Sequence, residues 1–65
     1  MKIKYFQDAD TLDIELRREG IVGSRDLDEN TVLDLDSGGN TCAITVEHAS
    51  DRTGLRRFWY EQMAT

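Results

Sequence analysis

The chain has 65 residues, of which 32% are charged, with 13 acidic and 8 basic side chains and a formal net charge of -5. This length allows a single small domain, residues 1–65, and the excess of acids argues against a basic surface for nucleic acid. The single cysteine, Cys42, excludes an internal disulfide, and Cys42 with His48 supplies too few ligands for a Cys/His zinc site. No apolar run approaches the roughly 20 residues that span a bilayer. The N-terminus has no apolar core of signal-peptide length, so we expect a cytoplasmic protein that binds neither membrane nor nucleic acid.

The acidic residues are concentrated between positions 8 and 36. Ten acidic residues fall in this range against three arginines, which gives a local net charge of -7. Such an imbalance suits an ordinary solvated surface, and it also suits a face that docks on a basic protein. The residues after Ala49 carry a slight excess of positive charge.

The beginning of the chain alternates apolar and polar residues with a period of two, which is typical of half-buried β-strands. The pattern covers residues 1–6, MKIKYF, and residues 11–17, TLDIELR. The predicted inward positions are Met1, Ile3, Tyr5, Leu12, Ile14 and Leu16. The intervening QDAD is turn chemistry, because aspartate side chains accept hydrogen bonds from nearby backbone N–H groups.

Three further strands are predicted between residues 21 and 48. Residues 21–28, IVGSRDLD, give the weakest pattern, and Gly23 indicates a bulge there. Residues 31–36, TVLDLD, and residues 41–48, TCAITVEH, alternate more regularly. The short segment DSGGN between them is typical of a β-hairpin turn.

The end of the chain changes to a helical period. Apolar and neutral side chains recur with helical spacing at Leu55, Phe58, Trp59, Gln62 and Met63. Ser50 or Asp51 is expected to cap the start of this helix. A helix of about ten residues is marginal alone in water, so its aromatic stripe must pack on this sheet or on a second chain.

These patterns predict an α+β fold, with an antiparallel sheet of four to five strands in meander order over residues 1–50. One amphipathic C-terminal helix follows over residues 51–65. A domain of this size is marginally stable without a disulfide, a metal or oligomerisation, so we expect a homodimer. The helix packs over its own sheet or crosses to the second copy. The predicted partner or dimer interface consists of Leu55, Phe58, Trp59 and Met63.

The acidic hairpin partly matches the sequence pattern of a calcium-binding loop. Asp34, Asp36 and Gly39 match positions 1, 3 and 6 of such a loop. Position 5 is Gly38, which has no side-chain oxygen, and position 12 is Thr45, which is no bidentate ligand. The segment is therefore predicted to be a hairpin turn, and we expect no metal site and no cofactor.

Other chemistry has weaker support. Cys42 and His48 would lie about 20 Å apart along an extended strand, too far to act as nucleophile and base. No spacing favours a triad of His48 and an aspartate with Ser24 or Ser50. Arg52, Arg56 and Arg57 next to Phe58, Trp59 and Tyr60 could stack RNA, but the acidity of the chain favours a solvated arginine edge beside a buried aromatic stripe.

The whole pattern resembles a small bacterial family called domain of unknown function 2283. The resemblance covers residues 1–50, with a Met-Lys-Ile-x-Tyr strand, an acidic turn, an alternating strand, a Leu/Val-Asp-x-Asp-x-x-Gly hairpin and an Ala-Ser ending. The matching positions are Tyr5, Asp8, Asp10, Leu12, Ile14, Leu16, Asp34, Asp36, Gly39, Ile44, Glu47, Ala49 and Ser50. Phe6, Asp13 and Ala43 depart from the usual Asp, Tyr and Gly. The resemblance implies a small β-rich fold, no assigned catalytic residues and, for some members, a role as an antitoxin.

The favoured hypothesis is a small acidic protein-interaction module, not an enzyme, that binds a basic partner such as a toxin. The predicted acidic docking face consists of Asp13, Glu15, Asp26, Asp34 and Asp36. The alternative is a small metal-dependent or hydrolytic module that uses surface carboxylates and a histidine: Asp8, Asp10, Asp34, Asp36 and His48. A free-standing structural protein is the third hypothesis.

Overall fold

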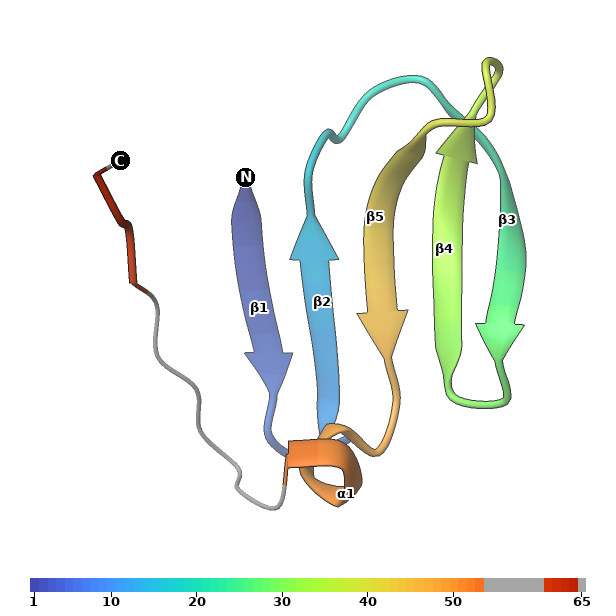
Figure 1. Ribbon diagram of the computed structural model, residues 1–65. Helices are drawn as coiled ribbons and strands as arrows, with labels where there is room; N and C mark the ends of the chain where they lie inside the picture. The colour runs from blue at the N-terminus through green and yellow to red at the C-terminus, as the bar shows by residue number, and fades with distance from the viewer. Residues whose placement is uncertain (54–60, 65) are drawn as a thin grey trace.

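The computed structural model describes residues 1–53 and 61–64. Its elements are β1 (Lys2–Phe6), β2 (Thr11–Glu15), β3 (Ile21–Asp28), β4 (Thr31–Asp36), β5 (Thr41–Val46) and α1 (Ala49–Thr53). The five strands form one antiparallel sheet (Figure 1). The sequence therefore predicted the β-strands and the turns at QDAD and DSGGN correctly, with β3 and β4 matched residue for residue.

The strand order is β1-β2-β5-β4-β3, so the predicted meander is wrong. Strand β5 lies at the centre of the sheet, and the connection from β2 passes the ends of β5 and β4 to reach β3 (Figure 1). Composition explains this order. Strand β5, TCAITV, has no charged residue, whereas every residue of β3 is exposed and three of them are charged. A central strand is covered by neighbours on both sides, so the uncharged strand occupies that place.

Strand β3 is irregular at both ends. Its register against β4 shifts between Ile21 and Gly23 and again between Asp26 and Asp28, and the first shift confirms the bulge predicted at Gly23. The residues inside the two shifts, Val22 and Leu27, are 69% and 60% exposed. Bulges and charges are the usual means by which an edge strand avoids pairing with another chain.

Cross-strand register places the side chains on two faces. One unbroken row of paired residues crosses the sheet from Ile3 through Ile14, Ile44 and Leu33 to Arg25. We call this side the apolar face, and its apolar members are Ile3, Tyr5, Leu12, Ile14, Leu33, Leu35, Ile44 and Val46. All eight are only half-buried. Among the residues whose burial is described, the buried ones are Thr31, Cys42, Ala43 and Ala49.

The C-terminal helix differs from the prediction. Helix α1 begins at Ala49 rather than after Ser50, and residues 61–64 have no regular secondary structure, so a helix that runs through Gln62 and Met63 is wrong there. The predicted interface residues Leu55, Phe58 and Trp59 lie outside the described residues. No helix in the described part of the chain is long and apolar enough to cross a membrane.

Candidate protein-interaction surface

The face opposite the apolar one carries the five acids of the predicted docking surface, and we call it the acidic face. Asp13 and Glu15 lie on β2, Asp26 on β3, and Asp34 and Asp36 on β4. These acids share one side because of the strand register. Each of them either pairs across strands with a residue of that side or lies two positions away from such a residue in its own strand. Strand pairing therefore gathers carboxylates that are up to 23 residues apart in the sequence.

The two halves of the acidic face differ in charge balance. On the β1 side, Lys4 stands opposite Asp13 and Lys2 stands opposite Glu15. Directly opposed charges of opposite sign attract each other across a sheet. On the β3 side, Asp26 stands opposite Val32, and Asp34 stands opposite Ser24 and Ala43. Asp26 and Asp34 are therefore diagonal neighbours on adjacent strands, because Asp34 lies two positions from Val32, the residue opposite Asp26. Diagonal neighbours are about 7–8 Å apart, so these two acids form the negative centre of the face.

Asp36, in contrast, holds the turn that follows it. Its Oδ1 accepts hydrogen bonds from the backbone N–H groups of Gly38 and Asn40, both at 2.9 Å. Its Oδ2 accepts a 2.8 Å bond from Arg17 Nη2, which ties the β4–β5 turn to the connection after β2. Gly39 completes the turn with a φ of 81°, a conformation that suits glycine. The sequence correctly predicted a turn here, and Asp followed by Gly and Asn was the signal for its hydrogen bonds.

The same contacts act on the ionisation of Asp36. The hydrogen bond from the Asn40 backbone N–H is the main reason that the pKa of Asp36 lies below its ordinary value of 3.8. Burial opposes this shift, whereas the Asn40 side-chain amide, the Gly38 N–H and the Arg17 guanidinium add to it. The folded protein therefore favours the carboxylate form of this group.

We expect Asp36 to make the protein less stable in acid. Because its pKa is lowered by folding, its contribution is complete above the ordinary pKa of 3.8 and is lost as the pH falls through the lower folded-state pKa. Urea titrations at about pH 6 and about pH 3 should show a larger drop in the free energy of unfolding for the wild type than for Asp36→Asn. Equal drops in the two proteins would contradict this assignment.

A second cluster lies at the opposite end of the sheet, around Asp10 in the β1–β2 turn. The Tyr5 hydroxyl donates to Asp10 Oδ1 at 2.5 Å, and the Ser50 hydroxyl donates to Asp10 Oδ2 at 2.5 Å. The backbone N–H of Ser50 lies 3.1 and 3.2 Å from the two carboxylate oxygens, and Ala49 N–H donates to the Asp10 carbonyl at 2.9 Å. Asp10 has a φ of 49°, a conformation in which aspartate is commoner than most residues.

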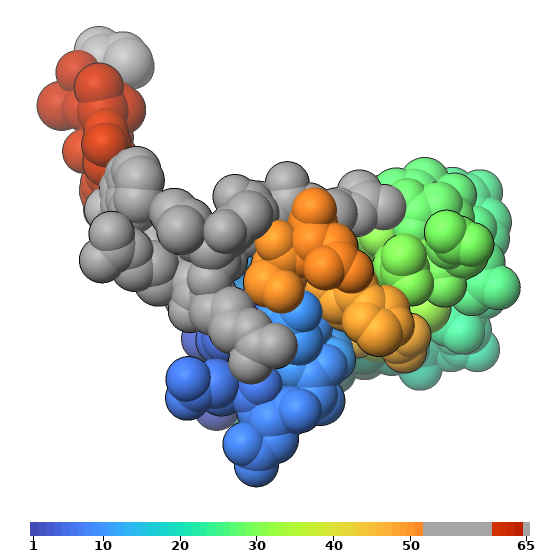
Figure 2. Space-filling view, turned by 90° about the horizontal axis from the view of Figure 1, so that it is seen from below, coloured from blue at the N-terminus to red at the C-terminus, as the bar shows by residue number. Residues whose placement is uncertain are grey.

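Asp10 thus caps α1 from 40 positions away in the sequence. The prediction that Ser50 or Asp51 supplies the cap is wrong, because the acceptor is a carboxylate from the opposite end of the chain. Seen from this end of the sheet, α1 lies against the β1–β2 turn (Figure 2). The alternative metal-dependent or hydrolytic hypothesis included Asp10 on composition alone, and composition gives no signal for Tyr5 and Ser50 as its partners.

The residues of the alternative metal-dependent or hydrolytic hypothesis are not brought together. Asp8 and Asp10 lie in the β1–β2 turn, whereas Asp36 lies at the other end of the sheet, where β4 ends (Figure 1). Asp34 is on the acidic face, and His48 is exposed in the turn before α1. The described residues contain no group of three or more His, Cys, Asp or Glu side chains that could hold a metal ion.

Cys42 and Met63 lie in opposite environments. Cys42 is 1% exposed in the middle of the sheet, and its thiol lies 3.8 Å from the Asn40 carbonyl. Met63, the one member of the predicted C-terminal interface that the structure describes, is 74% exposed. The arginines and aromatic residues at 56–60, which were considered as an RNA-stacking patch, lie outside the described ranges, as do the side chains of 52 and 53.

The fold and its contacts define a small antiparallel β protein with a single sheet, in which the carboxylate of Asp10 holds the start of helix α1. Residues 2–50 match the model of the family described as "Protein of unknown function (DUF2283)". The chain belongs to this family, which confirms the resemblance noted from its sequence. The match ends at Ser50, the residue that Asp10 binds. No curated protein and no solved structure is significantly similar to the chain.

Proposed function

We propose that the chain is a protein-interaction module that docks on a basic protein through its acidic face. The observation that supports this proposal is the register that gathers Asp13, Glu15, Asp26 and Asp34 on one side of the sheet. Carboxylates fixed on strands lose little further freedom when they bind, so they form good complements for a positive surface.

The β3–β4 half of this face is the proposed centre of contact. Asp26 and Asp34 have no lysine opposite them, whereas Asp13 and Glu15 do. Glu15 is also approached by Arg18 at 3.6 Å, and Asp36 is held by its own turn. This negative patch lies beside the exposed edge strand β3, and it would attract a basic partner and fix its orientation. A basic toxin is the kind of partner that the family resemblance implies.

The test begins with the partner. The immobilised chain should retain a basic protein from a lysate of the cells that make it, and raised salt should weaken retention. The retained protein is then identified, purified and titrated against two variants of equal charge change. The double variant Asp26→Asn/Asp34→Asn should bind at least about tenfold more weakly, because complementary charges at an interface are worth on the order of 1.5 kcal/mol or more.

The matched control is Asp8→Asn/Glu19→Gln, which removes two negative charges from exposed positions in turns. It should bind within about twofold of the wild type, because its charges lie outside the acidic face. Equal weakening by both double variants would mean that net charge, and not the acidic face, attracts the partner. Failure to retain any basic protein would reject the proposed function itself.

A further inference from the structure

Strand β3 is an edge of the sheet, and the direction of its backbone groups follows from the strands beside it. In an antiparallel sheet, successive residues of a strand direct their N–H and C=O groups to opposite sides. The bond from the Leu16 N–H to the Cys42 carbonyl shows that the even-numbered residues of β5 face β2, so its odd-numbered residues face β4. The bond from the Asp36 N–H to the Asn40 carbonyl agrees, because it directs the even-numbered residues of β4 toward β5.

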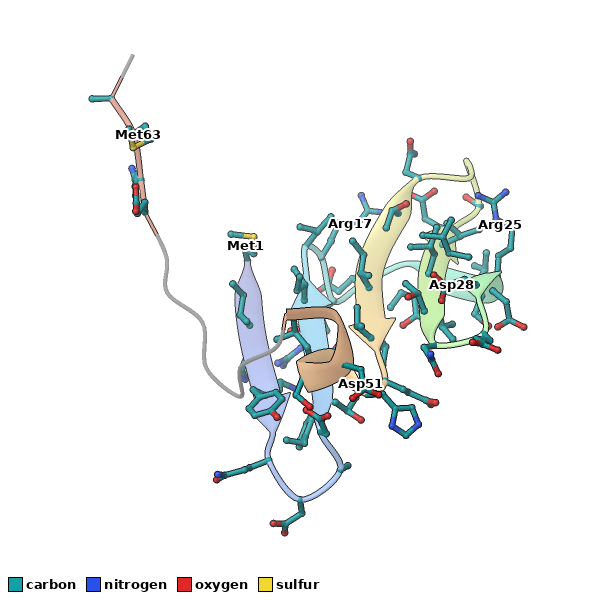
Figure 3. All side chains as sticks on the ribbon, turned by 60° about the horizontal axis from the view of Figure 1, so that its bottom comes forward. Met1, Arg17, Arg25, Asp28, Asp51 and Met63 are labelled. Carbon is teal, nitrogen blue, oxygen red and sulfur yellow. The ribbon has the colours of Figure 1, made fainter. Side chains whose placement is uncertain are left out.

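The same alternation places the backbone groups of Ser24 and Asp26 on the open side of β3. The odd-numbered residues of β4 face β3, where Leu33 stands opposite Arg25. Arg25 therefore directs its backbone groups toward β4, and its neighbours Ser24 and Asp26 direct theirs outward. Within the described part of the chain, these four outward groups make no hydrogen bond. Strand β3 also lies on the far side of the sheet from residues 61–64 (Figures 1 and 3).

Exposed apolar side chains flank this stretch of β3. Ile21 is 42% exposed, Val22 is 69% exposed and Leu27 is 60% exposed. A row of unpaired N–H and C=O groups is a template for pairing with another chain, and exposed apolar residues beside it favour contact. The two register shifts confine the regular part of the edge to residues 23–26. The edge therefore suits a short added strand and not a long one.

Resting on the proposed function, we propose that the basic partner adds a short extended segment to the β3 edge, antiparallel to β3, with basic side chains at alternate positions. One basic side chain stands opposite Asp26. The other stands opposite Ser24 and passes over this small residue toward Asp34, which lies opposite Ser24 on β4. In strand addition of this kind, the backbone hydrogen bonds supply affinity and the alternate side chains supply specificity.

Charge favours a basic segment over a second copy of this chain. The antiparallel register in which two β3 strands use both outward residues pairs Ser24 with Asp26, and it stands Arg25 opposite Arg25. Like charges directly opposite each other destabilise a strand pair, and each copy also has a net charge of -5. At the other edge of the sheet, Lys2 and Lys4 lie on the same side as the acids, so a basic strand would be repelled there.

A proline on the edge tests the proposal with the partner that the immobilised chain retains. Ser24→Pro removes one outward N–H and obstructs an added strand without changing the charge, and proline is tolerated at an edge where the N–H faces solvent. It should raise the dissociation constant at least about tenfold. Ser24→Ala is the matched control, because it also removes the hydroxyl but keeps the N–H, and it should bind within about twofold of the wild type. Circular dichroism checks that both variants keep the sheet.

Amide hydrogen exchange of the wild type gives a second measurement that needs no variant. The N–H groups of Ser24 and Asp26 should exchange at least about tenfold more slowly in the complex, because they become hydrogen-bonded. The N–H of Glu29, in the turn after β3, should change by less than about twofold. A complex that leaves the Ser24 and Asp26 amides unprotected, or equal binding by Ser24→Pro and Ser24→Ala, would overturn strand addition and leave docking through the acidic face intact.

A synthetic peptide separates this inference from the identity of the partner. The acetylated heptapeptide TVRVRVT carries two arginines at alternate positions, and TVEVEVT is its control of opposite charge. Titrated to about 10 mM, a range suited to a few contacts, the arginine peptide should shift the amide resonances of Ser24 and Asp26, and the glutamate peptide should not. No shift with the arginine peptide would overturn the inference. A shift without any basic protein retained from the lysate would support the edge site and reject the proposed function.

Discussion

Replacing Asp10 with alanine is expected to lower the free energy of unfolding by about 3 kcal/mol or more. The carboxylate accepts bonds from the Tyr5 and Ser50 hydroxyls and from the Ser50 backbone N–H. Hydrogen bonds to a charged group contribute about 1.5–3 kcal/mol each, and loss of a helix cap costs about 1 kcal/mol. A 65-residue domain has a total stability of about 3–10 kcal/mol, so Asp10→Ala should lose between about a third and all of it. Urea or thermal unfolding followed by circular dichroism measures this loss.

Single substitutions separate the contacts of Asp10. Tyr5→Phe and Ser50→Ala should each cost about 1–2 kcal/mol, and their sum should differ from the double variant because they share one carboxylate. Asp10→Asn keeps a residue that tolerates the left-handed backbone but removes the charge, so it should be milder than Asp10→Ala. Asp8→Ala, in the same turn but exposed, is the control and should change stability by less than about 0.5 kcal/mol. An equal loss for Asp8→Ala and Asp10→Ala would refute this role.

The contacts of Asp10 show why sequence patterns predicted strands better than their arrangement. Alternation over residues 31–36 and the DSGGN turn are local signals, and both the strand and the hairpin are as predicted. The bonds between Asp10 and Ser50 span 40 positions and have no local pattern. An aspartate in a turn is typical turn chemistry whether or not a distant helix uses it. The sequence therefore indicated an aspartate in a turn, but it gave no sign that Tyr5 and Ser50 are the partners of Asp10.

The strand order illustrates the same limit. A meander follows from pairing each strand with the next one, yet β5 pairs with β2 as well as with β4. The relevant signal was in the charges, because TCAITV has none and IVGSRDLD has three. That difference favours β5 at the centre and β3 at the edge. Alternation alone places Asp13 with Glu15, and Asp34 with Asp36, on one side of their own strands. The joining of these sides into one acidic face depends on the register between the strands, which the sequence does not give.

Ile44 occupies the centre of the apolar face, and Ile44→Ala is expected to cost about 2 kcal/mol in the free energy of unfolding. Its cross-strand neighbours are Ile14 on β2 and Leu33 on β4, so truncation leaves a gap in the middle of the row. A fully buried isoleucine would lose about 2–5 kcal/mol, and the half-burial of Ile44 places it at the lower end. Thr45→Ala, the next residue on the acidic face, should cost less than about 1 kcal/mol, because its contact to Asp13 is a long 3.4 Å hydrogen bond.

The protein concentration at which Ile44→Ala is measured distinguishes two origins of this loss. If the apolar face is closed by a second copy, part of the wild-type stability comes from association and increases with concentration. The deficit of Ile44→Ala should then widen by about 1 kcal/mol or more between about 5 µM and about 500 µM, whereas the deficit of Thr45→Ala should stay constant. A deficit for Ile44→Ala that is the same at both concentrations would mean that its packing is confined to one sheet. That result would count against a homodimer formed through the apolar row.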